Sequence, residues 1–164
     1  MPNYTSLATT TTVIRHATAN RAWSKGKIAK HATNHENVKT TAAVNFSIAG
    51  VTYQKGATGE FDLSALSCIT ETGAADTLTA QATATDRAYL LVLNAAGTAK
   101  IIQGTAVATG GTCVCPGCPE SYAPFAALKV ANASGSNFTL GTTALNAANV
   151  TTTYVDVSLA PATL

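Results

Sequence analysis

Apolar and polar residues alternate along much of the chain after residue 40, which is typical of β-strands with one face on a core. In the first such segment Val44, Phe46 and Ile48 fall on one side, and Ala49-Gly50 then offers a turn before the alternation resumes at Val51. This pattern predicts a β-hairpin in which the glycine supplies a positive φ.

The most apolar segment is residues 88–93, Ala-Tyr-Leu-Leu-Val-Leu, which is too apolar to lie at a surface. Asn94-Ala-Ala-Gly97 predicts a turn into a second strand over residues 98–102. A loop rich in Cys and Pro spans residues 112–124. Further strands are expected at residues 105–108, 125–132, 137–140 and 151–158, with a weak polar edge strand within residues 70–87.

The N-terminal part has a different pattern. Residues 13–32 are rich in Ala and Lys without Pro, which favours a helix, although Gly26 interrupts a poor 3.6-residue stripe. We therefore expect an extended or partly helical arm over residues 1–40. The β-rich body, residues 41–164, has short strands separated by Gly and Asn and no crossover helices. These features predict a mainly β fold of the antiparallel β-sandwich or jelly-roll-like type.

Composition points to a thin core. The chain has 32 Ala and 28 Thr among its 164 residues, so small side chains supply over a third of it. Only 11% of the residues are charged, far below the roughly 25% of ordinary soluble domains. Because Ala buries little surface, we infer that other copies of the chain or another protein complete the burial.

Charge is distributed unevenly. Residues 1–40 hold six Lys and Arg against the single acid Glu36, whereas residues 41–164 hold four bases and seven acids. A basic arm on a nearly neutral body is typical of a partner-binding segment, and we expect acidic protein surfaces to be its partners. Trp23 is the expected aromatic anchor. The residues predicted to bind the partner are Arg15, Arg21, Trp23, Lys25, Lys27 and Lys30.

The cysteines are Cys68, Cys113, Cys115 and Cys118, and three interpretations are open. One is a structural zinc site, since Cys115-x₂-Cys118 is a common half-site and two further thiols exist, although a second pair is missing. Another is a Cys115–Cys118 or Cys68–Cys113 disulfide. In the third, the cysteines pack as small hydrophobic residues in an irregular loop. No other cofactor is expected.

The sequence gives little basis for catalysis. No histidine follows residue 35, so the body has no histidine that could act as a base and activate a Ser or Cys nucleophile. Glu60 and Asp62 flank Phe61 in a loop, where acids are usually solvated or capping. No stretch approaches the ~18 apolar residues of a membrane span, and the N-terminus lacks the apolar part of a secretory signal. We expect a non-enzymatic protein made in a cytoplasm, without membrane contact.

Several segments resemble small virion structural proteins of tailed bacteriophages. They cover most of residues 39–158. The similarity is one of general residue pattern, and none of the segments is a diagnostic motif. The segments are Lys39–Tyr53, Tyr89–Gly97, Cys118–Val130, Phe138–Thr143 and Thr153–Asp156. The resemblance implies a β-rich capsid decoration or cement protein, or a head or tail fibre component, commonly trimeric and without enzymatic activity.

The leading hypothesis is a decoration protein on the capsid surface of a virion, assembled in the host cytoplasm, that binds the major capsid protein and copies of itself. One alternative is a fibre component that contacts the host surface through residues 70–76 and 110–124. Another, of a different class, is a zinc-binding nucleic-acid module. Direct nucleic-acid contact is disfavoured because Tyr4 and Trp23 are the only aromatic residues in the arm.

Overall fold

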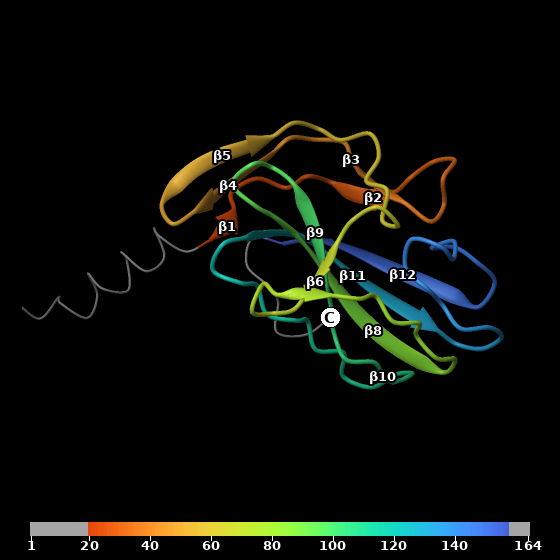
Figure 1. The fold of residues 1–164 in the computed structure, drawn as a ribbon. Helices are drawn as coiled ribbons and strands as arrows, with labels where there is room; N and C mark the ends of the chain where they lie inside the picture. The colour runs from red at the N-terminus through yellow and green to blue at the C-terminus, as the bar shows by residue number, and fades with distance from the viewer. Residues whose placement is uncertain (1–19, 158–164) are drawn as a thin grey trace, which may run out of the picture.

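The computed structural model describes residues 20–157, and this part of the chain is mainly β, without a helix. Two layers are visible in Figure 1, a large sheet and above it two small ones. The strands are β1 (Arg21–Ala22), β2 (Ile28–Lys30), β3 (Val38–Thr40), β4 (Val44–Ile48), β5 (Val51–Lys55), β6 (Cys68–Ile69), β7 (Ala75–Asp76), β8 (Thr85–Leu93), β9 (Ala99–Gln103), β10 (Val107–Ala108), β11 (Ala123–Asn132) and β12 (Val150–Asp156).

The large sheet is seven-stranded, in the order β12-β11-β8-β9-β6-β7, with β10 paired to β8. Its long strands β8 and β11 are antiparallel, with Leu128 opposite Tyr89 and a register shift between Pro124 and Ala126. One pair, β6 with β9, is parallel. The sheet is therefore mixed, although antiparallel pairing dominates it.

Strand β8 is buried on both faces. Tyr89, Leu91 and Leu93 point into a first core, and Leu90 and Val92 point into a second one on the opposite face. All five side chains are completely buried. Because successive side chains of a strand point to opposite faces, the sheet must be covered on both sides.

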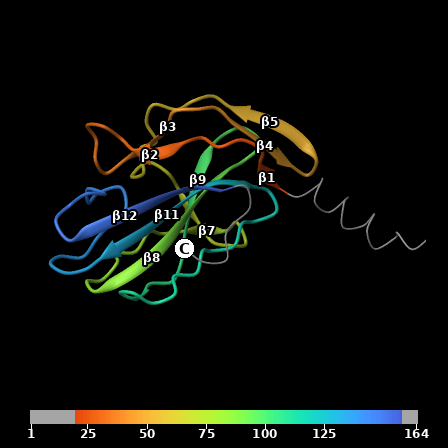
Figure 2. The same ribbon diagram turned by 180° about the vertical axis from the view of Figure 1, so that it is seen from behind.

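The small sheets cover the first face. The three-stranded sheet β1-β4-β5 and the β2-β3 pair lie over it, and both views show this layer above the large sheet (Figures 1 and 2). Phe46 of β4 is completely buried and stacks on Tyr53 of β5, with ring centroids 5.5 Å apart. Ala49 and Gly50 both have positive φ, 49° and 81°, as a two-residue hairpin turn requires. The hairpin expected here is confirmed.

The second face is covered by the loop rich in Cys and Pro. Cys115, Cys118 and Tyr122 from this loop pack with Leu90 and Val92 of β8. The second face is thus covered by the apolar side chains of a loop, whereas the first face is covered by strands.

The helix expected over residues 13–32 is wrong for its described part, residues 20–32, which contains β1 and β2. Arg21 and Ala22 pair with Ser47 and Phe46 of β4, and Ala22 is buried in the first core. Pairing and burial with distant residues outweigh a local helix propensity that is worth well under 1 kcal/mol per residue. Residues 20–40 are therefore built into the fold, and the described chain has no separate arm ending at residue 40. Residues 13–19 lie outside the described range.

The other strand predictions have mixed outcomes. The hairpin over residues 88–102 and the strands at 125–132 and 151–158 are confirmed as β8, β9, β11 and β12, with β12 ending at Asp156. The strand expected at residues 105–108 is reduced to β10. Residues 137–140 form no strand, only an isolated bridge from Phe138 to Gln81. The edge strand expected within 70–87 is reduced to β7, whose two exposed residues lie at the end of the large sheet, and residues 85–87 belong to β8.

Replacing Gly141 tests how tightly its loop is packed. Its φ is +78°, and an added Cβ would lie 2.5 Å from the backbone nitrogen of Ser64. We expect Gly141→Ala to lower the free energy of unfolding by roughly 3 kcal/mol or more, because backbone would have to move. Gly50→Ala is the matched control, since Gly50 has φ +81° but open space around it. It should cost only about 1 kcal/mol. Equal losses in urea denaturation would contradict the packing argument.

Candidate functional site

The first candidate site lies around Trp23, where the described chain begins. The Trp23 backbone N–H donates to the Asn45 carbonyl at 2.6 Å, and the Ser24 hydroxyl donates to the Ala43 carbonyl at 2.9 Å. The Asn45 N–H in turn donates to Ser24 Oγ at 2.8 Å. These bonds hold the segment against β4, so the Trp23 side chain projects from a rigid base.

Trp23 is half-exposed, with 51% of its surface accessible. The guanidinium carbon of Arg21 lies 3.6 Å from the centroid of the Trp23 ring, which is a cation–π contact. Arg21 and Trp23 are two residues apart on an extended segment and therefore share a face. Ala22, between them, points into the core. The cation thus fixes the orientation of a large aromatic ring that remains open to solvent.

A small hollow of about 170 Å³ adjoins the ring. Its lining comes from two ends of the described chain, residues 22–25 and residues 156–157. Lys25 brings a positive charge and Asp156 a negative one, and the Asp156 carboxylate also accepts a hydrogen bond from the Ile28 N–H at 3.2 Å. We call Arg21, Trp23, Lys25 and this hollow the Trp23 surface.

The structure brings together only some of the residues predicted to bind a partner. Arg21 contacts the Trp23 ring and Lys25 lines the hollow beside that ring, whereas neither Lys27 nor Lys30 lines the hollow. Lys27 has φ +53° directly before β2, and Lys30 ends β2. Arg15 lies outside the described residues.

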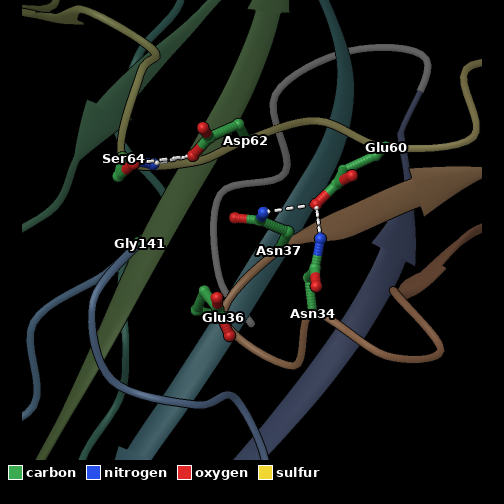
Figure 3. A pocket seen from close by; sticks show the side chains of 7 residues that line it. All are labelled: Asn34, Glu36, Asn37, Glu60, Asp62, Ser64 and Gly141. Atoms are coloured by element: carbon green, nitrogen blue, oxygen red, sulfur yellow. Dashed lines mark hydrogen bonds between the residues drawn. The ribbon is translucent and has the colours of Figure 1, made fainter.

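A second, larger hollow of about 480 Å³ is lined by polar side chains, as Figure 3 shows. The Glu60 carboxylate accepts hydrogen bonds from the side-chain amides of Asn37, at 2.7 Å, and Asn34. Asp62 accepts from the backbone N–H and the hydroxyl of Ser64, at 3.0 and 2.7 Å. Both acids therefore act as acceptors that shape their own loops.

These bonds also set the charge of the hollow. The amides of Asn34 and Asn37 lower the pKa of Glu60, and Ser64 lowers the pKa of Asp62. Both carboxylates are thus held ionised at neutral pH. A general acid requires the opposite, a raised pKa, so the pair does not have the arrangement of an acid–base couple. This agrees with the interpretation of Glu60 and Asp62 as capping groups.

Sequence reasoning missed Asn34, Asn37 and Asp156 as parts of these sites. Asn37 is buried, and its side-chain oxygen accepts from the Leu63 N–H at 3.0 Å. The partners lie 23 to 128 residues away along the chain. No local pattern carries such contacts, and the run Thr-Asn-His-Glu-Asn over residues 33–37 is at most a turn signal.

The four cysteines are free thiols in this structure. Cys68, Cys113 and Cys115 are buried, and Cys118 is half-buried. Within residues 20–157 no three His, Cys, Asp or Glu side chains form a group that could hold a metal. The packing of Cys115 and Cys118 in the second core matches the interpretation as small hydrophobic residues.

Burial raises the pKa of all four thiols. The pKa of Cys115 is raised to about 11 and that of Cys118 to about 12, with neighbouring thiols adding to the effect. Cys68 and Cys113 shift in the same direction. Nucleophilic or redox cysteines have lowered values instead, because the thiolate is the reactive form.

No protein-family model, curated protein or solved structure matches this chain. Within residues 20–157 there is also no helix long and apolar enough to cross a membrane.

The raised thiol pKa values predict slow alkylation. At pH 8 the folded chain should react with iodoacetamide far more slowly than the chain unfolded in urea, since burial keeps the thiols protonated and covered. The folded rate should rise only as the pH approaches 11, while the unfolded rate already rises near the ordinary thiol pKa of about 8.5. Mass spectrometry of the modified peptides measures both rates. Rapid labelling of Cys115 or Cys118 at pH 7 would contradict the packing described here.

Proposed function

We propose that the chain is a non-enzymatic structural protein that docks on a larger assembly, and specifically a decoration or cement protein on a bacteriophage head. The Trp23 surface is the proposed docking point. A second part of the proposal is that copies of the chain also contact one another. The layered strands are compatible with the expected sandwich-like class of decoration proteins.

The observation that carries the proposal is the exposure of Trp23. A half-exposed tryptophan keeps a large apolar surface in contact with water, which is unfavourable. Arg21 orients the Trp23 ring but does not cover it fully. Trp and Arg are the residue types that dominate binding energy at protein interfaces. A preoriented ring also loses little rotamer freedom on binding, which favours affinity.

Charge supports an acidic protein surface as the partner. Residues 20–40 carry Arg21, Lys25, Lys27, Lys30 and Lys39 against the one acid Glu36. Cations at the rim of an interface steer association and choose among partners more than they add affinity. An aromatic anchor within a cationic surface therefore fits the acidic face of a shell protein.

The chemistry of the other groups agrees with a structural role. The thiols are held protonated by burial, and the carboxylates of Glu60 and Asp62 are held ionised by hydrogen bonds. The raised thiol pKa values run against nucleophilic cysteine chemistry, and the lowered carboxyl pKa values run against a general-acid role.

Truncation of the tryptophan tests the docking point. Trp23→Ala should weaken binding to heads stripped of this protein by at least about tenfold, as expected for a buried aromatic hot spot. Co-sedimentation with the particles at increasing protein concentration measures the affinity. Val114→Ala is the matched control, because Val114 is 57% exposed and lies in the loop on the other face of the large sheet. It should leave binding unchanged.

Equal binding by both variants would contradict the docking role of Trp23. Cryo-electron microscopy of decorated particles separates the two virion roles. A decoration protein covers the whole shell, whereas a fibre component occupies few positions.

A further inference from the structure

Strand β5 ends the three-stranded sheet, so one of its edges has no neighbouring strand among residues 20–157. Val51, Thr52 and Gln54 are exposed, and Tyr53 and Lys55 are half-exposed. No Pro and no register shift interrupts the strand. Natural sheets usually protect such an edge, because its free N–H and C=O groups are a template for another strand.

The hairpin geometry identifies which groups are free. The Asn45 carbonyl accepts from the Trp23 N–H, so the backbone of Asn45 faces β1 and not β5. Its cross-strand partner Gln54 then also faces away from β4, because the two residues form a non-hydrogen-bonded pair. Thr52 and Ser47 also form a non-hydrogen-bonded pair, so the backbone groups of Thr52 face away from β4 as well. The N–H and C=O groups of Thr52 and Gln54 therefore point outward from the sheet.

We propose that β5 pairs antiparallel with β5 of a second copy, about a two-fold axis at Tyr53. Only this register places each free residue opposite a free residue, Thr52 against Gln54 of the second copy and the reverse. Each such pair exchanges two N–H···O=C bonds. The two small sheets become one continuous sheet in the order β1-β4-β5-β5-β4-β1.

The side chains suit the same register. Tyr53 lies opposite its own counterpart, so the stack of Phe46 and Tyr53 extends across the axis. Lys55, the one charged residue of β5, lies opposite Val51 of the second copy and not opposite another cation. The stem of Lys55 can then cover Val51, which is 54% exposed in the single chain.

The other sheet ends are poorer candidates. Strands β1 and β7 have two residues each. Strand β12 is longer, but some of its side chains hydrogen-bond to neighbouring segments. Asp156 accepts from the Ile28 N–H, and the Thr152 hydroxyl donates to the Leu145 carbonyl. Among the described strands, β5 is the long edge strand without such hydrogen bonds to a segment beside its free edge.

The dimer has a consequence for docking, which rests on the proposed function. A two-fold axis between antiparallel edge strands runs perpendicular to the sheet, so the outer faces of both copies point the same way. Arg21 shares the outer face with Ser47 and Thr52, and Trp23 follows it. Both Trp23 surfaces would then approach one shell together, and binding at one would raise the effective concentration of the other.

Proline substitution tests the edge without the shell. Thr52→Pro removes an outward N–H and leaves the ladder to β4 intact. We expect it to raise the dimer dissociation constant at least about tenfold, since two symmetry-related bonds are lost. Thr52→Val is the matched control and should dimerise like the parent chain. Sedimentation velocity over a concentration series measures the constant, and circular dichroism checks the fold. Gln54→Pro is the second variant if Thr52→Pro unfolds.

A cysteine scan tests the register. Tyr53→Cys places two thiols at a non-hydrogen-bonded pair with Cα atoms about 4.5 Å apart, within disulfide range, and mild oxidation should yield a covalent dimer. Gln54→Cys, which faces Thr52 of the second copy, should not crosslink to itself. A monomeric parent chain at every concentration, a three-fold assembly unaffected by Thr52→Pro, or crosslinking at position 54 would overturn the proposal. These outcomes need no particle, so they leave the docking role of Trp23 to its own experiment.

Discussion

The burial of β8 and β11 on both faces is the constraint on which the rest of the structure depends. Alternation along β8 sends Tyr89, Leu91 and Leu93 to one face of the sheet and Leu90 and Val92 to the other, and β11 also contributes side chains to both cores. Each face then needs its own cover. The strands of residues 20–55 cover one, and the loop carrying Cys115 and Cys118 covers the other. The positions of the Trp23 surface and of the thiols follow from this requirement.

Sequence patterns predicted the elements whose signal is local. The hairpin at Ala49-Gly50 and the one at residues 94–97 combine a turn signal with flanking apolar strands, and both are present. The N-terminal strands could not be found in this way. Arg21 and Ala22 gain their pairing from residues 46 and 47, and the local composition favours a helix. Phe138 shows the reverse error, since an apolar pattern there indicates burial but not a strand.

The candidate site was predictable in residue type but not in arrangement. A basic segment with a single tryptophan was visible in the sequence, and Arg21, Trp23 and Lys25 do lie together. Their attachment to a rigid sheet and the presence of Asp156 beside them depend on contacts across the whole chain. For the cysteines, spacing alone left zinc, disulfide and packing open. Burial against β8 is what favours packing, and no spacing rule reports burial.

The bond between the Ile28 N–H and the Asp156 carboxylate joins residues 128 positions apart. Ile28 is synthesised long before Asp156, so the layer formed by residues 20–55 cannot complete its contacts with the large sheet until β12 has left the ribosome. Nascent chains would therefore expose the apolar side chains of β2 and β4 until the strands they pack against have been made. Topologies dominated by such distant pairings fold slowly, because long loops must close before the contacts can form.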